Sequence, residues 1–153
     1  MGSAVGVNKL KIVTADTGGI SIAFPDVCKT PSPGGPVPIP YPNIARSKDT
    51  AKGSKKVKAD GKPICVKSSC FKKSVGDEPG KVGGIVSNTT RGKAEFVNCS
   101  FDVKIEGKGT PRSFDLMLHN KKNTPPFPLL QQPVVALGKQ AGKGVCWICG
   151  KKL

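Results

Sequence analysis

The chain has 153 residues, of which 37% are hydrophobic, and it carries a formal net charge of +15 from 25 basic and 10 acidic residues. This length and apolar content suffice for one domain with a buried core and give no reason to expect two. No run of about 18 apolar residues predicts a transmembrane helix, and Lys9 and Lys11 fall where a signal peptide would have its apolar stretch. We therefore expect a single domain, made in the cytosol, without a signal peptide or a stable membrane anchor.

The positive charge comes almost entirely from lysine, because only Arg46, Arg91 and Arg112 are arginines. Arginine is the residue that reads bases in a bidentate manner and stacks on aromatic rings. Aromatic residues make up only 5% of the chain, which is a low content for a protein that stacks bases on aromatic rings. These features disfavour a specific nucleic-acid partner. The lysines are expected to keep a strand-rich surface soluble and to stop its edge strands from pairing with other chains. Alternatively, they face an acidic partner.

Short strands are predicted along most of the chain, because 19 glycines and 14 prolines are spread over its whole length and no stretch shows a convincing helical spacing of apolar residues. Alternating segments bounded by turn residues lie at 20–24, 55–59, 63–67, 84–87, 93–97, 101–106 and 113–118. One helical turn or two could form within 128–140, although Pro133 interrupts that segment. The sequence therefore predicts an all-β fold with little helix.

The segment 36–42 reads PVPIPYP, in which every second residue is proline. Proline fixes φ and removes the backbone N–H, so such a segment is extended and runs along an edge or over a surface. Polyproline II would scatter Val37, Ile39 and Tyr41 around its axis, whereas a two-fold ribbon places all three on one face. We predict the second arrangement, with the ribbon held flat on the domain by these three side chains. A docking segment for an SH3-type partner is the alternative.

An internal repeat joins two parts of the chain. The segment VKADGKPICVKSS begins at Val57, and VKIEGKGTPRSFD begins at Val103. Each contains an acidic residue followed by glycine, a pair that suits a tight turn because glycine readily takes positive φ. The repeat predicts one hairpin used twice. Chance similarity between lysine- and glycine-rich segments is the alternative.

Four longer segments occur in a fixed order: FPDVCKTPSPGGPVPIPYPNIA (24–45), GKPICVKSSCFKKSVGDEPG (61–80), GGIVSNTTRGKAEFVNCSFDVKIEGK (83–108) and RSFDLMLHN (112–120). Together they resemble the PAAR-like domain of bacterial type VI secretion and related contractile injection systems, over roughly residues 23–120. The second copy of the repeat keeps Gly107, Lys108, Arg112 and Asp115 of the family's repeated unit. Residues 109–111 replace the Pro-Ala-Ala of that unit, so the chain is PAAR-like and not a strict PAAR protein.

The resemblance implies a small conical, or pyramidal, β-hairpin fold with pseudo-threefold repeats and a long irregular proline-rich segment. It also implies a non-enzymatic spike tip that caps the trimeric valine-glycine-repeat spike, one tip per trimer, sharpens it for membrane puncture and aids the delivery of effector or toxin proteins. Such a protein assembles in the bacterial cytoplasm and is injected into a target cell on firing. We expect one PAAR-like domain over residues 1–153, with a core at 20–128 and a Cys-x-x-Cys knuckle at 140–153.

A structural zinc ion is expected from two observations. Cys146 and Cys149 form a Cys-x-x-Cys-Gly turn that can grip one tetrahedral ion but needs two more ligands. PAAR domains commonly hold zinc near the apex with a histidine shortly after the Arg-x-x-Asp segment, where this chain has His119. With Cys28 before the proline ribbon, the predicted metal ligands are Cys28, His119, Cys146 and Cys149, with Cys70 in reserve. Ordinary or redox-active thiols at 146 and 149, and a structural His119, are the alternatives.

Two other function classes remain. An enzyme such as a small thiol hydrolase is not expected, because the chain has one histidine and shows no nucleophile-elbow motif and no cluster of carboxylates in the sequence. A basic zinc-knuckle protein that binds nucleic acid is the alternative to the spike tip. Its affinity would fall steeply with salt, whereas a tip would co-purify with a spike trimer.

Overall fold

The computed structural model describes residues 5–131, and its regular secondary structure is almost entirely strand, as predicted. In chain order the elements are β1 (Gly6–Val7), β2 (Leu10–Lys11), β3 (Ile20–Thr30), β4 (Val37–Arg46), a single 3-10 turn η1 (Ser47–Asp49), β5 (Thr50–Ala51), β6 (Lys58–Ala59), β7 (Lys62–Pro63), β8 (Cys70–Phe71), β9 (Ser74–Val75), β10 (Gly83–Gly84), β11 (Ala94–Phe96), β12 (Lys104–Ile105), β13 (Lys108–Gly109), β14 (Leu116–Leu118) and β15 (Phe127–Leu130). Within this part of the chain, no helix is long and apolar enough to cross a bilayer.

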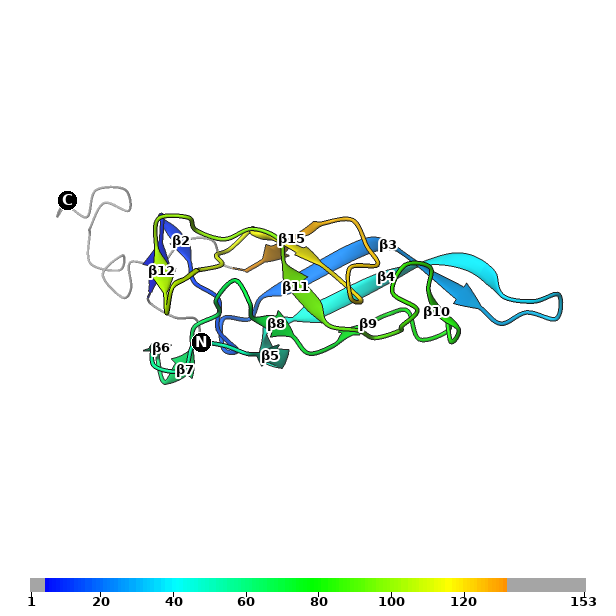
Figure 1. The fold of residues 1–153 in the computed structure, drawn as a ribbon, viewed down its shortest axis with the longest axis horizontal. Helices are drawn as coiled ribbons and strands as arrows, with labels where there is room; N and C mark the ends of the chain where they lie inside the picture. Colours follow the sequence, from blue (N-terminus) through cyan, green and yellow to red (C-terminus); the bar gives the residue numbers. More distant parts are fainter. Residues whose placement is uncertain (1–4, 132–153) are drawn as a thin grey trace, which may run out of the picture.

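The molecule is elongated and tapers from a broad end, which carries β2, β12 and the β6–β7 hairpin, to a narrow end formed by the turn between β3 and β4 (Figure 1). This taper agrees with the conical shape that the resemblance implies. A single sheet runs along the body in the order β5-β8-β11-β14-β15-β3-β4-β9, and β10 pairs with the outer half of β3.

The main core lies under this sheet and is formed by buried apolar side chains from five strands and two loops. Its two phenylalanine rings, Phe71 and Phe96, meet edge to face with centroids 5.7 Å apart, a favoured aromatic arrangement. The other members are Val13, Ala45, Cys65, Ala94, Met117 and Leu129. This core fixes the base of the β3–β4 hairpin, from which the narrow end projects.

The proline ribbon is β4, a regular strand that pairs with β3 from Ile20 opposite Arg46 to Thr30 opposite Val37, with a bulge between Ala23 and Asp26. The prediction of an extended, two-fold ribbon is therefore confirmed. The prediction that it lies flat on the domain is wrong: Val37 is 45% exposed and Ile39 37% exposed. The hairpin extends beyond the body (Figure 1), so this part of β4 has β3 beside it and no core beneath it.

The prolines of β4 face away from β3. Pro38 lies opposite Lys29 and Pro40 opposite Val27, and the carbonyl oxygens of Lys29 and Val27 accept hydrogen bonds from the other side, from the β10 region. In an antiparallel pair, two residues that are opposite each other turn their polar groups the same way, either both inward or both outward. The missing N–H groups therefore belong to the free edge of the hairpin, where strand addition would otherwise occur.

Three small hairpins form the broad end: β1–β2, β6–β7 and β12–β13. Each turns through two residues with positive φ: Asn8 and Lys9 at 51° and 67°, Asp60 and Gly61 at 51° and 78°, and Glu106 and Gly107 at 53° and 78°. This is the signature of a type I′ turn. The same hydrogen bond closes each repeat, from Ile12 N to Val5 O (3.3 Å), from Ile64 N to Val57 O (3.4 Å) and from Thr110 N to Val103 O (3.2 Å).

The hairpin is thus used three times, one more than the two copies found in the sequence, and this agrees with the pseudo-threefold repeats that the resemblance implies. The copy at residues 5–12 reads VGVNKLKI and lacks the acid-glycine pair by which the other two were found. The three hairpins share a second small core of Val7, Ile12, Ala59 and Ile64, against which Val103 and Ile105 pack.

Turn side chains also tie the hairpins together. Asn8 Nδ2 donates to both carboxylate oxygens of Asp102 at 3.0 Å, just before β12. Glu106 Oε1 accepts the backbone N–H groups of Lys55 and Lys56, at 2.9 and 2.7 Å, just before β6. The turn of the first hairpin thereby holds the segment that leads into the third, and the turn of the third holds the segment that leads into the second.

Candidate metal centre

Three buried side chains, Asp26, Cys28 and Asp77, meet where the cone narrows. Asp26 and Cys28 stand two residues apart on β3, so their side chains point to the same, inward face of the sheet, and Asp77 follows β9. Cys28 Sγ lies 3.7 Å from Asp26 Oδ1 and 3.9 Å from Asp77 Oδ2. All three residues are fully buried, and the three ligand atoms lie within 4.8 Å of one another. The group could hold a metal ion.

Amide groups from three segments surround Asp26. Asn43 Nδ2 donates to Asp26 Oδ2 at 2.5 Å, Asn120 Nδ2 to Oδ1 at 3.4 Å, and Asn123 Nδ2 also donates to Oδ1. Asp77 accepts the backbone N–H of Arg91, with its two oxygens 3.1 and 3.0 Å from the nitrogen. Since a buried carboxylate is costly unless it is hydrogen-bonded, these donors explain how Asp26 and Asp77 are tolerated in the interior.

Burial and mutual repulsion favour the protonated forms of Cys28 and Asp77. Burial, followed by the charges of Asp26 and Asp77, raises the pKa of the Cys28 thiol to about 12. Burial also raises the pKa of Asp77 to about 6, assisted by a hydrogen bond with Asp26 and by the charge of that residue. Both shifts have the direction expected for acidic groups crowded together in a medium of low dielectric constant. A bound cation would reverse this preference, because it favours the ionised form of every ligand.

The predicted metal ligands fall in different places. Cys28 lies in the cluster. His119 is fully buried after β14, where its Nε2 lies 2.8 Å from Ser21 Oγ, and burial lowers its pKa to about 4; it is not part of the cluster. Cys70 is on β8, paired with Ala51 and Glu95, and Cys146 and Cys149 lie outside the described residues.

Sequence reasoning missed Asp26 and Asp77 as candidate ligands. A signal was present for Asp26, which stands two positions before Cys28 and so shares a face with it if the segment is a strand. For Asp77, in the turn-like segment SVGDEPG, the sequence offered no sign that its side chain would be buried.

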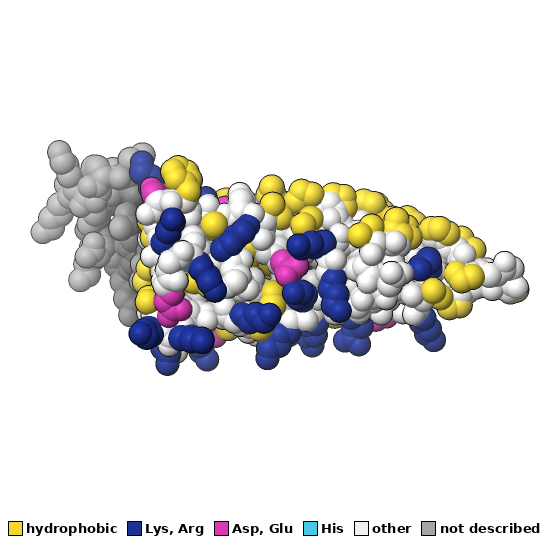
Figure 2. All heavy atoms as spheres, in the orientation of Figure 1, with side chains coloured by type: hydrophobic (Ala, Val, Ile, Leu, Met, Phe, Trp, Pro, Cys, Tyr) yellow, Lys and Arg dark blue, Asp and Glu magenta, His cyan; other side chains and the backbone are white. Residues whose placement is uncertain are grey.

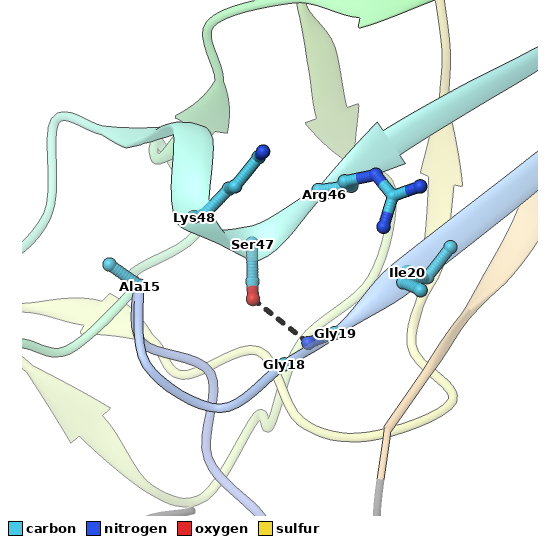
Figure 3. A pocket seen from close by; sticks show the side chains of 7 residues that line it. All are labelled: Ala15, Gly18, Gly19, Ile20, Arg46, Ser47 and Lys48. Carbon is cyan, nitrogen blue, oxygen red and sulfur yellow. Dashed lines mark hydrogen bonds between the residues drawn. The ribbon is translucent and has the colours of Figure 1, made fainter. Parts of the chain in front are cut away.

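A shallow hollow lies at the other end of the β3–β4 hairpin, lined by Ala15, Gly18, Gly19, Ile20, Arg46, Ser47 and Lys48 (Figure 3). Ser47 Oγ accepts the backbone N–H of Gly19 at 2.8 Å, so the most inward hydroxyl group is already used. The volume of the hollow, about 120 Å³, is well below the roughly 300–1,000 Å³ of typical small-molecule sites. The hollow is not a convincing substrate site.

Comparison with known proteins identifies the family. A family profile described as a toxin PAAR-like domain matches residues 19–126. The chain is 42% identical over 158 residues to DNase toxin Tse7 of Pseudomonas aeruginosa, and the match covers 95% of this chain but only 40% of Tse7. No solved structure matches.

The name of Tse7 overturns one expectation from the sequence. A protein without enzymatic activity was expected, yet this close relative is a DNase toxin, so the family includes enzymes. The expectation rested on motifs within this chain alone, and the chain spans less than half of the length of that relative.

The tapered β fold, the repeated hairpins and the family match agree: the chain belongs to the toxin PAAR-like domain family.

Proposed function

We propose that this chain is the tip of a type VI secretion spike, which docks its broad end on the trimeric spike protein and leads with its narrow end. The observation that carries the proposal is the set of three equivalent hairpins at the broad end. A symmetric trimer presents three identical surfaces around its axis. A single chain can engage all three only if it offers three similar surfaces itself, and the hairpins at 5–12, 57–64 and 103–110 supply them.

The narrow end supports the leading role. Between Thr30 and Arg46 the chain has no charged residue, although 23% of the whole chain is charged. Lysine and arginine side chains are spread over the visible face of the body, while the narrow end, at the right, shows mainly apolar and uncharged atoms (Figure 2). Removing charge and edge N–H groups lowers the cost of moving a strand out of water. These features suit a point that enters a membrane.

The relative that is a DNase toxin supports a role in toxin delivery. We propose that the protein travels with a toxic activity, either on its own full-length chain or on a bound effector, into the target cell. Nuclease activity is the second candidate function, favoured by the name of Tse7 alone. Incubating the full-length protein with plasmid DNA and Mg²⁺ tests it: nicked or linear plasmid is the expected product of a nuclease.

A structural zinc ion near the narrow end is also proposed. The buried Asp26, Cys28 and Asp77 offer two carboxylates and one thiol, which are ligand types that zinc accepts. The narrowing cone has little apolar area to bury, so a metal there would replace part of a core.

Docking is tested by co-purification with the trimeric valine-glycine-repeat spike. We expect a complex of one tip and three spike chains. Lys62 and Lys108 hold the same position after the turns of two hairpins and are exposed; reversing both charges (Lys62→Glu, Lys108→Glu) should weaken the complex tenfold or more. The matched control reverses Lys81 and Lys121, which are exposed residues away from the hairpins, and should bind normally. Binding that is unaffected by the first pair but lost with the second would contradict docking by the broad end.

A further inference from the structure

The outer face of the main sheet is apolar where β15, β3 and β4 lie side by side. Side chains alternate between the two faces of a strand, and the inward-facing Ala23, Ala45 and Leu129 are fully buried in these three strands. The alternate positions face outward: Pro128 and Leu130 on β15, Ile20, Ile22 and Phe24 on β3, and Pro42, Ile44 and Arg46 on β4. Arg46 is the one charged residue in this outward set.

The outward side chains are open to solvent and adjacent to one another. Phe24 is 54% exposed, Ile22 48% and Leu130 47%. Leu130 lies opposite Ile20, and Ile22 lies opposite Ile44, so the set is continuous across the three strands. Hydrophobic side chains gather along the upper margin of the body, over β15 and β3 (Figure 1, Figure 2). A continuous exposed apolar patch of this kind marks an interaction surface.

Basic side chains flank one end of this face. A hollow beside β4 is lined by Ile44, Arg46, Lys48, Asp49, Lys73 and Val75, so three basic residues and one acidic residue meet there. The side chains of Arg46, Lys48 and Lys73 are exposed. At its other end the face continues into the β3–β4 turn, and no residue between Thr30 and Arg46 is charged.

These features select among the possible occupants of the face. Two copies of this chain repel each other, because each carries a net charge of +15. Strand addition is excluded on β15 and β3, since both already have a paired strand on each side. An anionic lipid bilayer fits both properties, because apolar side chains enter the boundary of headgroups and acyl chains while lysine and arginine meet the phosphates.

We propose that the outer face of β15, β3 and β4 binds reversibly to an anionic lipid bilayer. Ile22, Phe24 and Leu130 enter the boundary region, and Arg46 and its basic neighbours in the hollow contact the lipid phosphates. This contact lies along the flank of the cone, and so differs from the entry of the narrow end proposed above. It goes beyond the docking of the broad end and can be tested without the spike.

The experiment measures binding of the full-length chain to vesicles of phosphatidylcholine and phosphatidylglycerol, three parts to one, by sedimentation. The Ile22→Ser, Phe24→Ser protein should bind these vesicles at least tenfold more weakly, because two large apolar side chains no longer enter the lipid. The matched control is Val97→Ser with Phe101→Ser, which removes side chains that are 40% and 87% exposed outside this face, and it should bind normally.

A charge series tests the basic end of the face. The Arg46→Gln, Lys73→Gln protein should lose most of its preference for these vesicles over pure phosphatidylcholine. The control Lys55→Gln, Lys56→Gln removes the same charge from exposed residues just before β6 and should keep most of that preference. Equal losses in the two proteins would assign the binding to the overall positive charge and overturn the proposal.

A fluorescent reporter gives a measurement that does not depend on loss of binding. Trp147 is the single tryptophan of the chain, so Phe24→Trp in a Trp147→Phe background places one indole on the face. Its emission should shift to shorter wavelength on adding the vesicles and should be quenched by lipids with brominated acyl chains. Phe101→Trp in the same background is the control and should show neither change.

Two outcomes would overturn the proposal directly. One is an unshifted Phe24→Trp emission together with full vesicle binding by the Ile22→Ser, Phe24→Ser protein. The other is a shift that the purified spike trimer produces without vesicles, which would assign the face to a protein partner. A shift with vesicles and none with the spike supports the lipid surface, whether or not the broad end docks on that spike.

Discussion

His119 is the single histidine of the chain, and the structure gives it a buried role. Its Nε2 lies against Ser21 Oγ, while its Nδ1 is buried without a partner among the described residues. Burial disfavours the charged ring and lowers its pKa from 6.5 to about 4. Near neutral pH His119 is therefore a neutral, buried group in this structure, and its role as a metal ligand stays a prediction.

The titration of His119 can be followed without ambiguity, because one imidazole gives one set of NMR signals. We expect a neutral ring at pH 6 and a midpoint near 4. In the unfolded chain the ring takes up a proton below about 6.5, so its contribution to stability is complete above that pH and is lost as the pH falls toward 4. A midpoint at or above 6.5 would show that the ring is exposed or paired with a carboxylate.

Thr110 breaks the symmetry of the small core at the broad end. It occupies the position held by Ile12 and Ile64 in the other two repeats, and its Oγ1 is buried without a partner among the described residues. An unpaired buried hydroxyl group destabilises by about 1 kcal/mol or more.

Replacing Thr110 with valine keeps the shape and removes the unpaired group. Thr110→Val should therefore raise the melting temperature by about 2–4 °C, measured by circular dichroism. Thr17→Val is the control: the Thr17 hydroxyl group is buried, donates to Thr14 O at 2.8 Å and accepts from Thr14 N at 3.2 Å, so its loss should lower the melting temperature. A drop in both variants would mean that Thr110 has a partner in solution.

At the scale of the element, the three hairpins differ most in their turns. All three place two consecutive residues in the left-handed region, but the second of them is glycine only at 61 and 107. In the first hairpin it is Lys9, with φ of 67°. A residue with a side chain costs roughly 1 kcal/mol in this conformation relative to glycine.

Exchanging the residues at these turns should move stability in opposite directions. Lys9→Gly creates an Asn-Gly pair, the preferred sequence for this turn, and should stabilise the protein by about 0.5–1 kcal/mol in urea unfolding. Gly61→Ala should destabilise it by a similar amount, although no atom lies within 4 Å of the added methyl group. Equal effects of both substitutions would show that turn conformation is not the cause.

At the scale of the whole molecule, the two ends present different surfaces. The broad end presents the hairpins, and the narrow end presents an uncharged hairpin with a proline edge (Figure 2). The buried group at Asp26, Cys28 and Asp77 lies between them and joins the narrow end to the body.

Changes at one end should leave the other unaffected. Val37→Lys with Ile39→Lys places two charges on exposed positions of the narrow end, and each lysine costs about 2.5–3.5 kcal/mol at the centre of a bilayer. We expect normal binding to the spike but reduced killing of target bacteria in a competition assay. The Lys62→Glu, Lys108→Glu protein should fail in both. Loss of spike binding in the narrow-end variant would contradict this division.

The sequence by itself determined the features that arise from neighbouring residues. Glycine and proline spacing predicted an all-β chain, alternation in 36–42 predicted an extended ribbon, and the acid-glycine pairs at 60–61 and 106–107 predicted two hairpins. These predictions succeeded because turn geometry and the alternation of side chains depend on a few consecutive residues. The first hairpin escaped detection because Asn8 and Lys9 adopt the same turn with different residues.

Only the tertiary structure decided which distant residues meet. Asp26, Asn43 and Asp77 come together because β3 and β4 form one long hairpin and β9 pairs with the base of β4. The spacing of neighbouring residues does not predict the order of strands in a sheet. The exposure of Val37 and Ile39 was likewise settled by how far the hairpin extends beyond the core. Burial and the clustering of charged groups depend on how the whole chain packs. The sequence alone therefore does not distinguish a buried aspartate from an exposed one.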